Sequence, residues 1–279
     1  MMAKMYHTRP GTGEASMIFP KPLPTIPHPL PTGQRHPKRG RLMTLAAAFR
    51  CTKGGILLCS DQEWNDAGVS KRRINKNYRI SGLPPCEFFI SGAGPDTAII
   101  KAWTEMNSCL WEASNAGRDV LADHKAILES VLSGVCKQQA KTLKLWPMYL
   151  LIVVAPRALD RVPMLYRTDD NMLIDEPYYY AVGSGKPVAD FLADRLYEFG
   201  RLDKRSLATV AAFILREAGE SSIGVGMGAN MVFIHDGEKS MHFITPGVVK
   251  EMQEGIPSLP DAIWSYWPEH VKFTEWYAT

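Results

Sequence analysis

The sequence has no apolar stretch long enough to cross a bilayer. Its longest continuous candidate covers residues 148–155, whereas a membrane-spanning helix needs roughly 20 apolar residues. The N-terminus also lacks the apolar core and cleavage pattern of a secretory signal. These absences argue against a membrane or secreted protein, and we expect a cytoplasmic one.

Cysteine is scarce, and the chain has neither disulfide nor metal-ligand spacing. The five cysteines are odd in number, and Cys59 and Cys136 stand among apolar residues. We therefore interpret the cysteines as buried thiols in a reducing compartment. The histidines His124, His235 and His242 also lack the spacing of metal ligands. No metal and no cofactor are expected.

The charge is nearly balanced. Lys and Arg number 32 and Asp and Glu number 29, giving a net charge of +3, which is too small to indicate a nucleic-acid or membrane-surface partner. The run Gly183-Ser184-Gly185-Lys186 resembles a phosphate-binding loop, but Tyr180 stands where the first glycine should be and Pro187 replaces the magnesium-binding hydroxyl. A nucleotide site is therefore excluded.

Composition divides the chain into three parts. Residues 1–42 hold eight of the 20 prolines, end in a basic run and have no helical or alternating period, which predicts an extension without a fold. Residues 43–244 hold the periodic segments and are predicted to form a single domain. Residues 245–279 carry many aromatic side chains without a recognisable period, so we expect them to pack on the core as a C-terminal extension, with a role at a subunit interface as the alternative.

The domain begins with an expected hairpin. Strand-forming residues flank Lys53-Gly54-Gly55, and the glycines can supply the positive φ of a tight turn. Folding back at this turn brings Asp61 beside Thr44 or Leu45. The hairpin therefore predicts a hydroxyl and a carboxylate side by side.

The remaining segments alternate between groups of strands and pairs of helices. Because both kinds of element have apolar faces, this order predicts two stacked sheets between two helical layers, an α+β fold arranged as a four-layer αββα sandwich. Apolar residues at helical spacing predict helices over residues 95–113, 122–142, 187–199 and 204–218. Further strands are predicted over residues 87–92, 149–155, 162–167, 178–182, 223–234 and 240–244.

Five short motifs in order carry a family resemblance. Thr44-Leu45-Ala46 opens one strand, Cys59-Ser60-Asp61 closes the next, Lys76 follows fifteen residues later, the segment 90–96 leads into a helix, and Gly183-Ser184-Gly185 follows a strand. Together they resemble a proteasome β-type subunit and its bacterial relatives, the HslUV peptidase subunit and the Anbu proteins. The resemblance covers residues 43–244. It implies an N-terminal-nucleophile (Ntn) hydrolase fold and a threonine-type peptidase.

The resemblance also implies a catalytic role for each matched residue. Thr44, as the first residue of the mature chain, would be the nucleophile, with Asp61 and Lys76 as the charged pair behind it. Gly92 would offer an oxyanion-binding amide, and Ser184 a supporting hydroxyl. The substrate would be a peptide or protein, and the chain would assemble as a homo-oligomeric ring. The resemblance does not decide whether an unfoldase binds this ring.

The chemistry of these residue types agrees with that assignment. A threonine hydroxyl needs a base, and an α-amine with a pKa of about 7.7–8 is partly neutral near working pH. A buried lysine would lower the pKa of that amine by like-charge repulsion and itself needs a carboxylate such as Asp61. Gly92 lets a carbonyl approach the backbone N–H closely.

Two departures from the family pattern leave alternatives open. Leu42-Met43 precedes Thr44, where relatives with a propeptide usually have glycine, which argues against self-cleavage. Because Met43 can serve as a translation start, we expect the natural chain to begin at Thr44 after loss of Met43, with residues 1–42 as either a start-site artefact or a removed leader. No aspartate stands in the stretch 220–228, where the family has one near the nucleophile. A non-catalytic ring subunit and an Ntn amidase acting on small amides therefore remain as alternatives.

Overall fold

The computed structural model describes residues 44–51, 54–66, 70–73, 76–142, 147–158, 161–222, 225–226, 228–235 and 241–255. The extension predicted for residues 1–42 and the part of the tail after residue 255 lie outside the described residues. No helix in the described ranges has both the length and the apolarity needed to cross a membrane.

The described strands form two five-stranded sheets and one small two-stranded sheet, all with antiparallel pairing. The first large sheet has the order β10-β1-β2-β11-β12 and the second the order β5-β6-β7-β8-β9, while β3 pairs with β4. The strands are β1 (Leu45–Arg50), β2 (Ile56–Asp61), β3 (Glu63–Asp66), β4 (Ser70–Arg73), β5 (Tyr78–Ile80), β6 (Cys86–Ala93), β7 (Tyr149–Pro156), β8 (Met164–Asp169), β9 (Met172–Asp175), β10 (Tyr179–Gly183), β11 (Ala229–Ile234) and β12 (Met241–Ile244).

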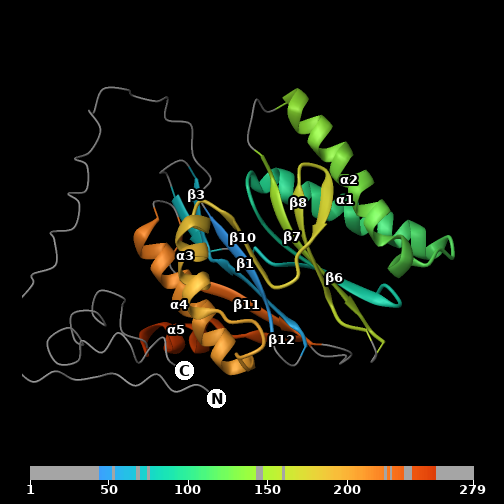
Figure 1. Ribbon diagram of the computed structural model, residues 1–279. Coiled ribbons are helices and arrows are strands. Elements are labelled where there is room, and N and C mark those ends of the chain that lie inside the picture. Colours follow the sequence, from blue (N-terminus) through green and yellow to red (C-terminus); the bar gives the residue numbers. More distant parts are fainter. Residues whose placement is uncertain are drawn as a thin grey trace, which may run out of the picture. The chain divides into compact units, whose positions relative to one another are not determined.

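Helices cover the outer faces of the two large sheets. Side chains of α1 and α2 share one apolar cluster with the second sheet, and those of α3 and α4 share another with the first sheet. A third cluster lies between the sheets. This arrangement confirms the predicted four-layer αββα sandwich (Figure 1). The helices are α1 (Asp96–Asn115), α2 (Val120–Thr142), α3 (Lys186–Leu196), α4 (Lys204–Ser221) and α5 (Pro246–Glu254).

The predicted hairpin is formed by β1 and β2. Gly54 and Gly55 have φ values of 80° and 92°, which a residue with a Cβ adopts only at a cost, and the Cys51 amide donates to the Gly55 carbonyl at 3.0 Å. The register pairs Ala46 with Ser60. Asp61 therefore lies across from Leu45, one residue from Thr44.

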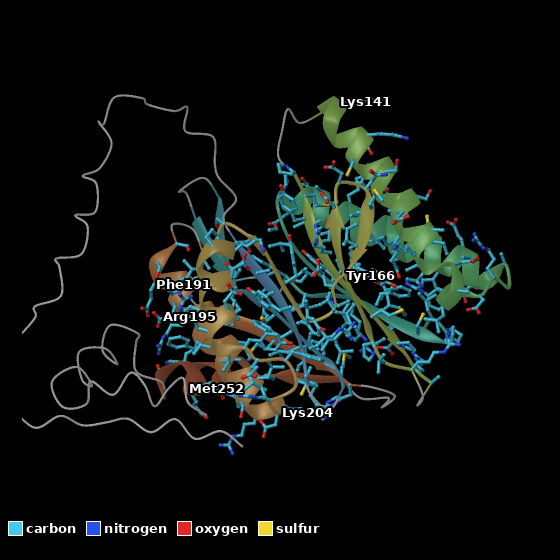
Figure 2. All side chains as sticks on the ribbon, viewed as in Figure 1. Lys141, Tyr166, Phe191, Arg195, Lys204 and Met252 are labelled. Atoms are coloured by element: carbon cyan, nitrogen blue, oxygen red, sulfur yellow. The ribbon has the colours of Figure 1, made fainter. Side chains whose placement is uncertain are left out.

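A polar contact fixes the packing of α2 on the second sheet. Tyr166 on β8, labelled in Figure 2, brings its hydroxyl within 3.0 Å of His124 Nε2 on α2. His124 Nδ1 in turn lies 2.6 Å from the Leu121 carbonyl. Burial raises the pKa of Tyr166 to about 12, so its hydroxyl keeps its proton. The buried histidine is thus a packing residue of the core, as expected for a histidine without metal-ligand spacing.

Several predicted boundaries are wrong by two residues or more, and in two cases the structure shows the reason. The helix predicted for residues 187–199 ends at Leu196, because Tyr197 turns into extended backbone and its hydroxyl donates to the Arg50 and Tyr178 carbonyls. The strand predicted for residues 223–234 begins at Ala229. Before it, Gly228 takes a φ of 91°, which is incompatible with a continuous strand.

Several short elements were not predicted. The stretch after the hairpin holds β3, β4 and β5, and β9 follows β8 after a tight turn. The tail expected to lack a regular period begins with α5, whose Val249 is buried in the cluster of the first sheet. All five cysteines are free, but Cys109 and Cys136 are partly exposed, so the expectation of five buried thiols is wrong for these two. Both lie on the outer helices α1 and α2, where one side faces solvent.

Candidate active site

A buried hydroxyl, carboxylate and ammonium group meet at the start of β1. The Thr44 hydroxyl donates to Asp61 Oδ1, and Lys76 Nζ donates to Thr44 Oγ1 at 2.7 Å and to Asp61 Oδ1 at 2.8 Å. Thr44 is 6% exposed, Asp61 0% and Lys76 7%. Because all three residues are buried, solvent and salt screen the ion pair only weakly. The ammonium therefore faces the oxygen lone pairs of the hydroxyl, while the hydroxyl proton points at the carboxylate.

Lys76 reaches this point because of the pairing between β5 and β6. Tyr78 pairs with Ile90, and continuing this register by two residues sets Lys76 opposite Gly92. The buried Ser91 hydroxyl donates to the Lys76 carbonyl at 3.3 Å. The lysine backbone is thereby attached to β6 of the second sheet while its side chain contacts two residues of the first. The site lies where the two sheets meet.

Asp61 is held by backbone amides as well as by side chains. The Leu45 amide donates to Oδ1 at 3.0 Å and the Gly226 amide to Oδ2 at 2.9 Å. Sequence reasoning missed Gly226, because a backbone donor leaves no side-chain signature. The available signal was the alternation of glycines at 224, 226 and 228 just before a strand, which is typical of close backbone approach.

The turn from residue 183 to 185 binds the main-chain carbonyl of Thr44. The Ser184 hydroxyl donates to the Thr44 carbonyl at 3.4 Å and the Gly185 amide to the same oxygen at 3.5 Å. Gly183 has a φ of 106°, and a Cβ there would lie 2.1 Å from that oxygen. Ser184 therefore contacts the carbonyl of Thr44 in this structure, and the turn fixes the direction of the threonine backbone.

Gly92 occupies a position that admits no side chain. A Cβ on Gly92 would lie 2.6 Å from both Leu150 Cδ2 and the Tyr149 carbonyl, well inside normal contact. Gly92 lies next to Ala93, whose Cβ is 3.1 Å from the position that a Cβ on Gly183 would take. The Gly92 backbone is therefore close to the turn that holds Thr44.

A second carboxylate lies near the ion pair. Asp96 opens α1, and one of its carboxylate oxygens is buried without a hydrogen-bond partner in the described part of the chain. Burial raises the pKa of Asp96, the Lys76 ammonium opposes this shift, and the Asp61 charge adds to it. The burial of Tyr78 itself, followed by the nearby Asp96 charge, raises the pKa of Tyr78. Asp96 therefore adds negative potential beside Lys76.

The stretch that lacks the expected late aspartate reaches the site through its backbone. Helix α4 ends at Ser221, Ser222 caps it, and the Val225 amide donates to the Ser222 carbonyl. Gly226 then supplies the contact to Asp61. No group of three His, Cys, Asp or Glu side chains suited to a metal ion occurs in the described ranges.

Comparisons with known proteins agree on one family. The proteasome subunit family model matches residues 45–234. Solved structures similar to this chain include the Anbu (ancestral beta-subunit) protein from Yersinia bercovieri and Anbu from Hyphomicrobium sp. strain MC1, each with a TM-score of 0.63, at 13% and 12% identity. A Gly-1 mutant of the Hyphomicrobium protein matches at 14% identity with the same TM-score. Each match covers 82% of this chain and 99% of the other. No curated protein sequence gives a significant match.

Proposed function

The chain belongs to the proteasome subunit family, and from that premise we propose that it is a threonine-type peptidase that hydrolyses peptide bonds through an acyl-enzyme on Thr44. The observation that supports this proposal most strongly is the buried contact of Lys76 Nζ with both Thr44 Oγ1 and Asp61 Oδ1. Burying an ammonium group is unfavourable unless it is paired. A plain structural ion pair would not need a threonine hydroxyl that contacts both of its partners just before a strand.

The proposed reaction has two halves. In the first, Thr44 Oγ1 attacks the substrate carbonyl carbon, its proton passes to the neutral α-amine of Thr44, and the Lys76 ammonium lowers the energy of the oxygen as its charge develops. The tetrahedral intermediate collapses when the leaving amine takes the proton, which leaves an ester on Oγ1. In the second half, the α-amine takes a proton from water as the water oxygen attacks the ester carbon, and it passes this proton to Oγ1 as the bond between Oγ1 and the acyl carbon breaks and the carboxylic acid product leaves.

The other site residues have supporting roles in this proposal. The Gly92 amide stabilises the oxyanion, an effect of about 3 kcal/mol for one donor. Asp61 orients the Lys76 side chain, and Ser184 with its neighbours holds the Thr44 carbonyl. Because the amine and the hydroxyl belong to one residue, the χ1 rotamer of Thr44 sets the distance between base and nucleophile. The contacts of Oγ1 with Asp61 and Lys76 hold that rotamer.

The mechanism requires Thr44 to be the first residue of the mature chain. An amide nitrogen inside a peptide bond is not a base, so a chain that retains Met43 has no α-amine at the site. We propose that the preceding residues are removed, with loss of a methionine as the last step. A chain in which Thr44 is never freed would instead be a non-catalytic subunit of the same fold.

We further propose that the chain assembles as a homo-oligomeric ring, with unfolded protein chains as its substrates and an unfoldase as a potential partner. Family membership supports the assembly. Helix α1 also exposes Ile100 and Trp111 to solvent, and such apolar side chains are common at contacts between subunits.

Substitution of Thr44 tests the proposal. In protein whose N-terminus is verified as residue 44 by mass spectrometry, Thr44→Ala should abolish hydrolysis of fluorogenic peptides, and Thr44→Ser should retain part of it because the hydroxyl remains. Thermal unfolding of the two variants should agree closely. Undiminished turnover by the alanine variant would reject the mechanism. Turnover of small acyl amides but not of peptides would favour the amidase alternative.

A further inference from the structure

A buried network of side-chain amides lies directly behind the ion pair. The amide nitrogen of Gln62 donates to the Ala229 carbonyl at 3.0 Å and to Asn230 Oδ1 at 2.9 Å. Its backbone amide donates to the Gly228 carbonyl at 3.3 Å. Gln62 is 8% exposed. One residue beyond Asp61, it therefore joins the end of β2 to the start of β11 through three hydrogen bonds.

The network reaches Asp61 through the backbone of the glycine segment. Ala229 pairs with Asp61 in the sheet, and Gln62 holds residues 228–230 against this end of β2. Gly226, two residues before Gly228, donates its amide to Asp61 Oδ2. The position of this donor thus depends on how firmly the start of β11 is attached.

The same network reaches Lys76 from the other side. Asn77 Nδ2 donates to the Asn230 carbonyl at 3.4 Å, so the residue after Lys76 is tied to the residue that receives a hydrogen bond from Gln62. Ser91 holds the Lys76 carbonyl from β6. Both charged partners are thereby connected to Asn230, Asp61 through Gln62 and the strand start, and Lys76 through Asn77.

We propose that Gln62 is a positioning residue for the reaction: through Asn230 and the start of β11 it sets the distance between Lys76 and the Thr44–Asp61 pair. It touches neither the nucleophile nor the proposed oxyanion position, and it acts through its neighbours. A glutamine suits this place because both hydrogens of one amide nitrogen find acceptors at once. The inference rests on the proposed function, since that function assigns the activation of Thr44 to the ion pair of Asp61 and Lys76.

The test compares Gln62→Met with wild type in the assembled protein. Methionine keeps the length and volume of the side chain and removes its donors. We expect the Gly226 amide to exchange its hydrogen about tenfold faster, which corresponds to the loss of about one net hydrogen bond. In protein that turns over peptides, we expect kcat to fall about tenfold while KM stays nearly unchanged, because the change affects the transition state and not substrate binding.

A matched control uses the other buried glutamine in the described part of the chain. Gln253 on α5 is 9% exposed and donates from Nε2 to the Ala212 carbonyl at 3.2 Å. Gln253→Met removes the same type of bond far from the site in sequence, where α5 packs against α4. It should change neither kcat nor the exchange of the Gly226 amide.

A second variant separates hydrogen bonding from packing. Gln62→Glu keeps the shape, but its ionised carboxylate faces two acceptors, whereas its protonated form can donate one bond. The ratio of variant to wild-type kcat should therefore rise as the pH falls for Gln62→Glu and stay flat for Gln62→Met. A flat ratio for both variants would contradict a role as hydrogen-bond donor.

The exchange measurement separates this proposal from the proposed function. If wild type turns over no peptide, the proposed function fails, and exchange at Gly226 still decides whether Gln62 holds the network. Unchanged exchange in Gln62→Met would overturn the network in either case. Faster exchange with unchanged kcat in an active enzyme would overturn the positioning role alone.

Discussion

The buried pair of Asp61 and Lys76 gives the sharpest stability prediction. Asp61→Asn removes the charge that balances a lysine only 7% exposed, and breaking a buried ion pair from one side costs about 3–5 kcal/mol of the free energy of unfolding. Lys76→Met should cost less. Asp61 would still accept from Thr44 Oγ1 and from the Leu45 and Gly226 amides.

The double variant, Asp61→Asn with Lys76→Met, has no uncompensated charge. Its loss of unfolding free energy should be smaller than the sum of the two single losses by about 2 kcal/mol or more, because replacing both members of a buried pair is often nearly neutral. The clash between the new amide of Asn and the Gly226 donor occurs in the single and the double variant alike, so it cancels in the cycle. Urea unfolding at neutral pH measures all four proteins.

An exposed ion pair provides the control. Lys250 and Glu254 lie 3.5 Å apart on α5, with side chains 72% and 66% exposed, so the same cycle there should give a coupling of about 0.5 kcal/mol or less. A coupling between Asp61 and Lys76 no larger than this would refute the reasoning. It would mean that the two charges do not depend on each other in the folded protein.

Two further changes probe the surroundings of Thr44. Gly183→Ala places a Cβ 2.1 Å from the Thr44 carbonyl oxygen at a φ of 106°, so it should lower the free energy of unfolding by more than about 2 kcal/mol. Gly117→Ala has a φ of 74° and open space around its Cβ, so it should cost only about 1 kcal/mol. Thermal unfolding compares the two variants, and equal losses would contradict the close contact at Gly183. Since burial raises the folded-state pKa of Asp96 above its unfolded value of 3.8, the folded protein binds more protons in the window above 3.8 and loses stability as pH rises through it. Asp96→Asn should therefore be more stable than wild type at neutral pH and lose that advantage below pH 3.8, and urea titrations that show the same difference at both pH values would contradict the shift.

The sequence predicted the sandwich well because its long elements carry strong periodic signals. Helix α1 buries Ala98, Ala102 and Met106 at helical spacing, and Gly54-Gly55 marks the hairpin turn. The missed elements are short. Strand β9 has 4 residues, and α5 has 9, of which Val249 and Gln253 are buried, so neither carries enough repeats to reveal a period.

The contacts of the site differ in the same way in how far the sequence pattern could predict them. The hairpin placed Asp61 next to Thr44 from sequence alone, because register follows from the turn. The family resemblance predicted Lys76 at the site, but no local pattern encodes the pairing of β5 with β6 that places it there. The Gly226 amide and the Gln62 network depend on where β11 begins, and the sequence pattern started that strand six residues too early. A backbone donor and the misplaced start of β11 thus account for what sequence reasoning missed.

The central claim is that Thr44 carries both the nucleophile and its base. A peptidyl epoxyketone reacts with a hydroxyl and an amine on the same terminal residue, so it tests both groups at once. Mass spectrometry of protein purified from its native source and treated with this probe should find one adduct, on Thr44 as the N-terminal residue. Peptide hydrolysis by a protein in which Thr44 remains unmodified within a longer chain would contradict the account.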